Sequence, residues 1–289
     1  MHGRHARIGV SMKYSWERPA DDKSSAGTAS VRARLAAIGL SRLVLFLDFD
    51  GTIVPIGARP EKVRLSEVMT EALDKLARRL PIAVVSGRPV NDLRRVMGLK
   101  HIHYVGLHGF SYATPGKRPS WLVPRPPRRM VRKWKKALEA VAAKVRGAWV
   151  EDKGIAVALH DRQVATGNRR RLRRQALDAL QVWVREKQIR LLRGKRIMEA
   201  LPPIDWDKGT AVMQLLQKPW ARSRVPVYFG DDITDLPALR RIARSGLAIQ
   251  VGSIPDAPKT CLRLANSNAV EKVLRDMAKR LDGPAFRDC

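Results

Sequence analysis

The chain has 289 residues, of which 45% are hydrophobic, so it is long enough for one large or two smaller domains with a real core. Its 56 lysine and arginine residues outnumber 27 acidic ones, and the formal net charge of +29 would attract nucleic acid or small phosphorylated compounds alike. Only two cysteines, Cys261 and Cys289, are present, which excludes a disulfide framework and a cysteine zinc site.

The sequence lacks membrane and secretion signals. No apolar run approaches the roughly 20 residues of a membrane span. Residues 1–30 lack the apolar centre of a signal peptide, and we expect them to form a mostly disordered basic tail. These features predict a cytoplasmic protein without a membrane partner.

Strands and helices alternate in the first part of the chain. The run at 42–50 is apolar throughout and ends in carboxylates, which is typical of a central strand covered on both faces. Apolar residues recur at helical spacing over 65–80, with Ser66 as a plausible N-cap. The expected helices are 31–40, 65–80 and 91–99, and the expected strands are 42–50, 81–88 and 102–109. This alternation indicates an α/β core with a parallel sheet.

The pattern changes after Gly109. Residues 114–130 contain five prolines and predict a linker. The segments that follow are a basic helix at 128–146, a strand pair within 147–162, an arginine-rich helix at 168–187, and two strands around a turn at Gly194. We therefore predict that residues 113–203 form an α+β unit inserted into the core.

The α/β pattern then resumes. The expected elements are helices at 205–218, 236–246 and 267–281, and strands at 225–232 and 247–252. Residues 31–112 and 204–289 would together form one Rossmann-like core, interrupted by the inserted unit.

Polar residues follow three of the predicted core strands. In open α/β sheets ligands bind outside the carboxyl ends of the strands, so these residues should meet at one place. They are Asp48 and Asp50, then Ser86 and Arg88, then Asp231, Asp232 and Asp235, with Lys208 at the start of a helix. Carboxylates gathered there would repel one another without a counter-charge, and Mg²⁺, which prefers oxygen ligands, would supply it. Lysine and serine beside such an ion suit phosphate oxygens.

This set of residues predicts phosphoryl transfer. Asp48 would attack phosphorus as a nucleophile and form an aspartyl-phosphate. Asp50 would protonate the leaving alkoxide and then activate water as a base. Gly51 permits a tight turn, and Thr52 offers a hydroxyl and an amide to the phosphate.

The motifs resemble those of a known superfamily. D-x-D-G-T at Asp48, a strand-end Ser86, Lys208, and G-D-D-x-x-D ending at Asp235 occur in the order found in haloacid dehalogenase phosphatases. The resemblance implies a Rossmann-like core with an inserted α+β cap over the active site. The chain is more narrowly similar, over about residues 42–275, to the trehalose-6-phosphate phosphatases.

That resemblance implies a set of roles for individual residues. Asp48, the Asp50 carbonyl and Asp231 would hold Mg²⁺, with Asp232 or Asp235 in support, and Ser86 and Lys208 would grip the phosphoryl group beside Arg88. The cap residues that match sugar-contacting positions are Glu151, Lys153, Arg162, Lys195 and Glu199. The resemblance further implies a sugar-phosphate substrate and a functional partnership with trehalose-6-phosphate synthase.

Two departures from the family pattern leave the identity of the sugar undecided. Ser111 stands where the family often has a glutamate, and Leu236 replaces the acidic residue that often follows the Asp235 position. Sucrose phosphate and the phosphorylated glucosyl- or mannosylglycerates are alternative substrates. A basic nucleic-acid-binding protein on the same fold is a further alternative, which we do not expect because the catalytic residues are all present and aromatics are not interleaved with the basic runs.

Overall fold

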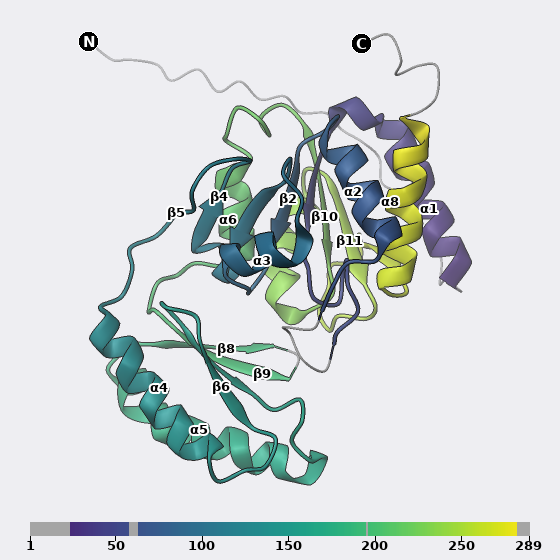
Figure 1. Cartoon of the computed structure of the whole chain (residues 1–289). Coiled ribbons are helices and arrows are strands. Elements are labelled where there is room, and N and C mark those ends of the chain that lie inside the picture. The colour runs from purple at the N-terminus through teal and green to yellow at the C-terminus, as the bar shows by residue number, and fades with distance from the viewer. Residues whose placement is uncertain (1–23, 58–62, 195, 282–289) are drawn as a thin grey trace, which may run out of the picture.

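The computed structural model describes residues 24–57, 63–194 and 196–281 and contains two sheets, each with its own helices (Figure 1). The larger sheet has eight strands in the order β12-β11-β10-β1-β2-β3-β4-β5. Its strands are β1 (Leu43–Leu47), β2 (Ile82–Val85), β3 (His103–Gly106), β4 (Ser111–Ala113), β5 (Ser120–Trp121), β10 (Val225–Gly230), β11 (Leu247–Val251) and β12 (Leu262–Leu264). All neighbours from β12 to β3 are parallel, and β4 and β5 are antiparallel additions.

Strand β1 lies at the centre of this sheet between β10 and β2, and all five of its residues are buried. Alternate β1 side chains enter two separate cores. Leu45 joins the core that contains residues of α1 (Ser24–Ile38), α2 (Glu67–Ala77), α3 (Val90–Met97) and α8 (Ser267–Arg280), whereas Phe46 joins the core beneath α6 (Lys208–Leu215) and α7 (Leu236–Ile242). Helices therefore cover both faces, as the continuous apolar run predicts.

The smaller sheet lies below the larger one in Figure 1 and has α4 (Arg128–Ala142) and α5 (Thr166–Arg185) on one face. Its strand order is β6-β7-β9-β8, all antiparallel. The strands are β6 (Trp149–Asp152), β7 (Val157–His160), β8 (Arg190–Gly194) and β9 (Ile197–Leu201). Residues such as Leu159 and Met198 pack against the two helices in a third core. The residues directly before and after them in each strand therefore point to the opposite face of the sheet. That opposite face is turned toward the larger sheet.

The α/β class, the parallel sheet and the separate α+β unit agree with the sequence predictions. We refer below to the larger sheet with its helices as the core and to the smaller sheet with α4 and α5 as the cap. Two boundaries differ from expectation. Strand β5 pairs with β4, so the larger sheet extends past residue 113 into the proline-rich segment expected to be only a linker.

The N-terminal helix is also longer than predicted. Helix α1 begins at Ser24, within the segment expected to be disordered, because Val31 and Leu35, one turn apart, are buried in the core and anchor it. The rest of the predicted tail, residues 1–23, lies outside the described residues. Among the described residues, no helix combines the length and apolarity needed to cross a bilayer.

Candidate active site

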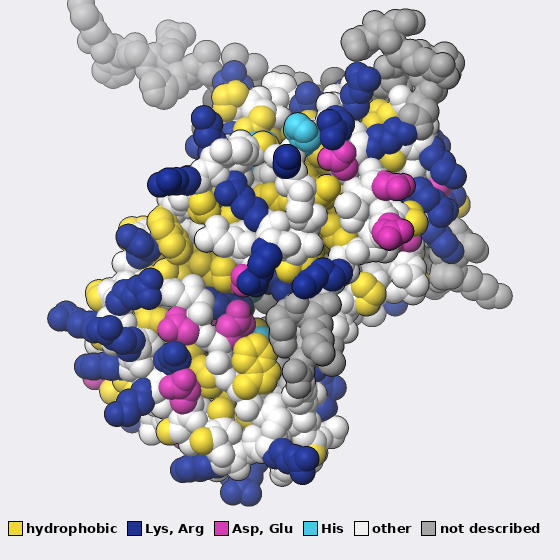
Figure 2. Space-filling model, viewed as in Figure 1, with side chains coloured by type: hydrophobic (Ala, Val, Ile, Leu, Met, Phe, Trp, Pro, Cys, Tyr) yellow, Lys and Arg dark blue, Asp and Glu magenta, His cyan; other side chains and the backbone are white. Residues whose placement is uncertain are grey.

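A cleft of about 320 Å³ lies between the carboxyl ends of the core strands and the open face of the cap sheet. Asp48 follows β1, Ser86 follows β2 and Asp231 follows β10, so the parallel register brings them to the same edge. This is the convergence that the three polar strand ends predict. The cap contributes the opposite wall, and lysine and arginine side chains cover much of the face seen in Figure 2.

Lys208 connects two of the carboxylates. Its Nζ atom donates to Asp48 Oδ1 at 2.6 Å and to Asp235 Oδ1 at 2.8 Å, and all three side chains are buried. Asp207 caps helix α6 by accepting from the Thr210 amide, which fixes the first turn that carries the lysine. Burial alone would lower the pKa of Lys208, but Asp235 and Asp48 outweigh it and raise the pKa above its ordinary value. The lysine is therefore a permanent cation in the site.

Asp235 is fully buried and uses both carboxylate oxygens. Its Oδ1 accepts from Lys208 and from the Tyr228 hydroxyl at 2.6 Å, and its Oδ2 accepts from the amides of Asp231 at 3.2 Å and Asp232 at 3.0 Å. These bonds hold the loop after β10 in place. Asp235 is thus placed to support the loop and orient Lys208.

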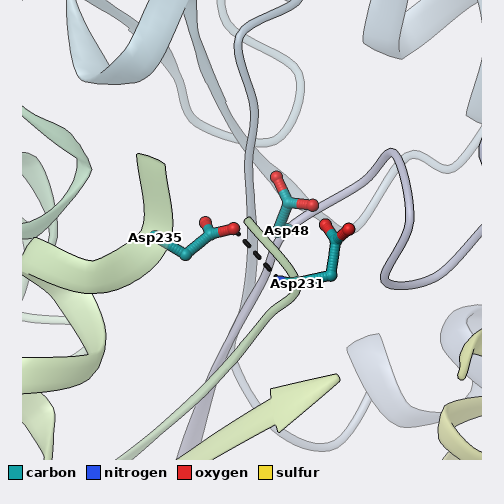
Figure 3. A group of neighbouring side chains, drawn as sticks. All are labelled: Asp48, Asp231 and Asp235. Carbon is teal, nitrogen blue, oxygen red and sulfur yellow. Dashed lines mark hydrogen bonds between the residues drawn. The ribbon is translucent and has the colours of Figure 1, made fainter. Parts of the chain in front are cut away.

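The group Asp48, Asp231 and Asp235 offers oxygen atoms that all lie within 4.8 Å of one another. Figure 3 shows the carboxylates of Asp48 and Asp231 side by side, whereas Asp235 reaches the Asp231 backbone amide from the far side. Because Asp235 is already engaged at both oxygens, Asp48 and Asp231 are the better placed to face a cation. Three buried carboxylates against one lysine leave an excess of negative charge, and an all-oxygen donor set suits a hard divalent ion such as Mg²⁺.

Asp48 itself is in an unusual electrostatic position. Burial and the nearby Asp235 raise the pKa of Asp48 well above its ordinary value, and Lys208 only partly opposes them. A cation beside it would favour the ionised form.

The backbone turn after Asp48 is also constrained. Gly51 has φ +96°, and a Cβ there would lie 2.2 Å from Asp231 Oδ2. Thr52 is buried next to it and donates to Asp231 Oδ1 at 3.5 Å.

The side chain of Asp50 points toward the loop that follows β2. Arg88 donates from Nε and from a terminal nitrogen to the two oxygens of Asp50, both at 2.6 Å. The Arg88 amide in turn donates to Ser86 Oγ at 3.1 Å, which orients the serine hydroxyl. The loop after β2 thereby joins Asp50 and Ser86 in one network that lines the cleft.

A second buried network crosses from the cap to the core. Glu199 of β9 accepts from Lys153 and is paired with Nε2 of His108, which follows β3, at 2.5 Å. Lys153 also donates to the Gly87 carbonyl at 3.0 Å. Burial alone would raise the pKa of Glu199, but Lys153 and His108 hold it well below the ordinary value. Glu199 therefore remains a carboxylate at neutral pH, able to accept from a hydroxyl of a ligand.

Strands β6 and β7 of the cap sheet add an aromatic surface. Glu151 Oε2 is 2.9 Å from His160 Nε2, and the His160 ring stacks on the Trp149 indole with centroids 3.7 Å apart and planes 2° from parallel. Arg162 reaches across to donate to the Gly57 carbonyl of the core. All four side chains line the cleft. Lys195, which the sequence places with this group, lies outside the described residues.

Comparison with known proteins identifies the family of this chain. A family model described as trehalose-phosphatase matches residues 46–264. The chain belongs to the trehalose-phosphatase family. It is 31% identical over 257 residues to probable trehalose-phosphate phosphatase D of Arabidopsis thaliana, covering 82% of this chain and 68% of that protein. It is 33% identical over 252 residues to trehalose-phosphate phosphatase of Mycobacterium tuberculosis, covering 80% of this chain and 60% of that protein.

The chain spans 65% of a rice relative, probable trehalose-phosphate phosphatase 4, over a 241-residue match at 30% identity that covers 81% of this chain. Among solved structures, the C-terminal domain of C. albicans trehalose-6-phosphate phosphatase superposes with a TM-score of 0.76 at 20% identity, covering 86% of this chain and 97% of that one. This likeness concerns the fold, a core built on a parallel sheet together with a cap.

Within this trehalose-phosphatase family member, the structure gathers most of the predicted residues around one cleft. The members of the predicted set that line it are Asp48, Asp50, Ser86, Arg88, Glu151, Lys153, Arg162, Glu199, Lys208, Asp231 and Asp232. Gly51, Thr52 and Asp235 lie directly behind this wall. Ser111 does not belong to it, because β4 carries its side chain to a second cavity.

Three side chains of the cleft were not predicted from the sequence. His108, His160 and Trp149 all line the cleft, although none of them is among the predicted site residues. The alternation of β6 carries a usable signal, since Trp149 and Glu151 are two residues apart and therefore share a face. No comparable signal marks His108, because its position depends on left-handed backbone at φ 57° in the turn after β3.

Proposed function

We propose that this protein is a Mg²⁺-dependent phosphatase that hydrolyses trehalose 6-phosphate to trehalose and phosphate. The observation that carries the proposal is Asp48, buried beneath the cap beside Lys208 and Asp231, with sugar-compatible cap side chains opposite. Membership of the trehalose-phosphatase family supports the substrate. We further propose that it works in the cytoplasm on material supplied by a trehalose-6-phosphate synthase.

In the proposed reaction, an oxygen of Asp48 attacks phosphorus, the bond to the sugar oxygen breaks, and an aspartyl-phosphate forms. Lys208 and Ser86 hold phosphoryl oxygens, and Thr52 closes the same side. Asp50 gives a proton to the departing sugar alkoxide and then takes one from the water that hydrolyses the intermediate. In this structure Arg88 fixes the direction of Asp50, and the pair would loosen when Asp50 exchanges a proton.

The metal would be held by Asp48, Asp231 and the Asp50 carbonyl, with Asp232 and Asp235 in support. When bound, Mg²⁺ would offset the negative charge that the carboxylates and the phosphate share. This role fits the carboxylate oxygens of Asp48, Asp231 and Asp235, which lie within 4.8 Å of one another.

The cap would hold the disaccharide. Glu199 and Glu151 accept from sugar hydroxyls, and Lys153 and Arg162 donate to them, so that both hydrogen-bonding characters of a hydroxyl are met. We assign Trp149 to the same surface, because an aromatic face packs against the C–H face of a pyranose ring. Closure of the cap over the core would exclude bulk water during phosphoryl transfer.

Phosphate release from a panel of substrates tests the proposal. The panel contains trehalose 6-phosphate, sucrose 6-phosphate, glucosyl-3-phosphoglycerate and mannosyl-3-phosphoglycerate. We expect the highest kcat/KM for trehalose 6-phosphate, and no turnover in a folded Asp48→Asn variant. A higher value for another member would overturn the substrate, and normal turnover by Asp48→Asn would overturn the mechanism.

A further inference from the structure

The side chain of His108 joins the core to the cap. The residue lies in the turn after β3, and its Nε2 atom is 2.5 Å from Oε2 of Glu199, which β9 of the cap carries. The side chains of His108, Glu199 and Lys153 are almost completely buried at this junction. The reaction proposed above does not use His108, so its conformation and its contacts call for another explanation.

The backbone of His108 has an uncommon conformation. Leu107 and His108 have φ values of 55° and 57°, in the left-handed region that few residues other than glycine adopt. Main-chain hydrogen bonds hold this turn: the His108 amide donates to the Ser86 carbonyl and the Leu107 amide donates to the Arg88 carbonyl, both at 2.9 Å. Because these bonds do not involve the imidazole, glycine or asparagine would suit the turn at least as well. The imidazole therefore serves another purpose.

The ring of His108 lies directly on Gly87. A Cβ atom at residue 87 would be 2.7 Å from both Cε1 and Nε2 of the imidazole, a separation that real Cβ atoms do not show. Glycine thus leaves the space that the ring occupies. Lys153 of the cap donates from Nζ to the carbonyl of the same glycine at 3.0 Å. The core imidazole and the cap lysine therefore meet at one residue of the loop that also carries Ser86 and Arg88.

The polar interactions of the His108 side chain are directed at Glu199. Since Glu199 is a carboxylate, Nε2 of the imidazole carries the hydrogen and donates it to Oε2. The other ring nitrogen, Nδ1, is buried and makes no hydrogen bond to any residue that the structure describes. Within the described part of the chain, the ring therefore acts as a donor through Nε2 and through no other atom.

Glu199 keeps acceptor capacity after these contacts. Its Oε1 accepts from Lys153 and its Oε2 from His108, whereas a carboxylate offers about four lone-pair sites. The side chain lines the catalytic cleft, so the remaining sites can face a ligand. Lys153 belongs to the cap, as Glu199 does, but His108 belongs to the core. Both oxygens of Glu199 are therefore held only when the cap lies against the core.

We propose that His108 is a positioning residue that directs Glu199 toward the sugar when the cap meets the core. The inference rests on the proposed function, in which Glu199 accepts from a sugar hydroxyl. The effect is confined to the sugar, because Ser86 and Lys208 of the core hold the phosphoryl group. A cap displaced from the core leaves Glu199 with Lys153 alone, so sugar recognition is complete only in the conformation that excludes bulk water.

Replacement of His108 by glutamine and by asparagine tests which ring nitrogen matters. The glutamine amide places an N–H donor near the position of Nε2, whereas the shorter asparagine places it near that of Nδ1. We expect His108→Ala and His108→Asn to raise KM for trehalose 6-phosphate by about tenfold with little change in kcat, and His108→Gln to restore most of the loss. A role limited to the backbone turn gives the opposite order, because asparagine tolerates left-handed backbone better than glutamine does. That order would overturn the proposal.

A substrate without a sugar and a double variant complete the test. Acetyl phosphate should be hydrolysed equally by the wild type and by all three variants, and parallel losses on both substrates would mean that His108 supports the catalytic loop instead. In a Glu199→Gln background, His108→Ala should have little further effect, whereas effects that multiply would show that His108 does not act through Glu199.

Failure of the proposed function would appear elsewhere, in the wild type itself. It would show as a higher kcat/KM for another sugar phosphate of the panel, and the His108 variants are then compared on that substrate. The order of glutamine and asparagine decides the positioning role in either case.

Discussion

Arg88 holds Asp50 through two parallel hydrogen bonds of 2.6 Å, one to each carboxylate oxygen. This bidentate arrangement fixes the direction of the side chain as well as its charge. Arg88 also lies over the Phe49 ring, 5.1 Å from its centroid, so the guanidinium is itself held. In this state Asp50 is an ion-paired acceptor, and proton transfer to a sugar oxygen requires the pair to loosen when the substrate enters.

The first prediction is that Arg88 acts mainly through Asp50. Replacing it by methionine removes the clamp, and we expect kcat to fall by about 10- to 100-fold because Asp50 is no longer aligned. Asp50→Asn should lower kcat further. The measurement is phosphate release in the wild type, both single variants and the double variant.

The double variant separates two roles for Arg88. If it positions Asp50, Arg88→Met should have little further effect in the Asp50→Asn background. If Arg88 instead binds the phosphate itself, the two effects should multiply, and the positioning role is then wrong.

The second prediction concerns removal of the metal. After exhaustive chelation we expect activity to be lost and to return with Mg²⁺. We also expect Mg²⁺ to raise Tm by a few degrees, because a ligand that binds only the folded state stabilises it, by about 2.7 kcal/mol at 100 times Kd. Asp231→Asn should reduce this rise, whereas Asp205→Asn, at an exposed position outside the cleft, should not. An enzyme that keeps full activity in chelator would contradict the metal assignment.

The sequence predicted the core of this fold well because several of its signals are local. The apolar run at β1 requires cover on both faces, and Ser66 caps α2 as its position indicates, accepting from the Met69 amide at 3.0 Å. Strands β5 and β12 escaped detection because they have two and three residues, too few for a period to be recognised. Their pairing depends on neighbours brought close by the tertiary fold.

The site residues show the same difference between local signals and contacts that depend on the tertiary fold. Asp48, Ser86 and Asp231 could be placed together because strand ends in a parallel sheet share one edge. The pairing of Glu199 with His108 could not, because 91 residues separate the two and the contact depends on how the cap meets the core. The departure at Ser111 is likewise explained only by the structure, which turns that position away from the catalytic cleft.

The third prediction assigns Trp149 to sugar binding. One indole face lies on His160, so the exposed remainder is presented to the cleft. We expect Trp149→Ala to raise KM for trehalose 6-phosphate by about 2- to 10-fold with little change in kcat, since a lost aromatic contact is worth about 0.5–1.5 kcal/mol. Trp149→Phe should restore most of the loss.

A small acyl phosphate, which has no sugar, serves as the control substrate. Its hydrolysis depends on Asp48 and its neighbours alone, so Trp149→Ala should leave its kinetics as in the wild type. Equal losses for both substrates would mean that the indole supports the fold of the cap, and the assignment to sugar binding would be withdrawn.

The fourth prediction is a pH dependence of stability that originates at His103. Its ring is buried, stacks on Trp220 with centroids 3.8 Å apart, and lies 2.8 Å through Nδ1 from the Tyr112 hydroxyl. Burial lowers the pKa of His103 to about 4, whereas an unfolded histidine titrates near 6.5. The neutral ring therefore stabilises the native state above pH of about 6.5, and this contribution is lost as the pH falls toward about 4.

Urea unfolding at pH 7.5 and at pH 5 measures this contribution. Over that interval His103 should account for roughly 2 kcal/mol of the decrease in the free energy of unfolding. His103→Phe keeps an aromatic ring against Trp220 but cannot titrate, so its decrease should be smaller than that of the wild type by about this amount. His101→Phe, at an exposed neighbouring position, should show the wild-type decrease. If His103→Phe and the wild type lose the same free energy between the two pH values, then His103 is not the group that titrates.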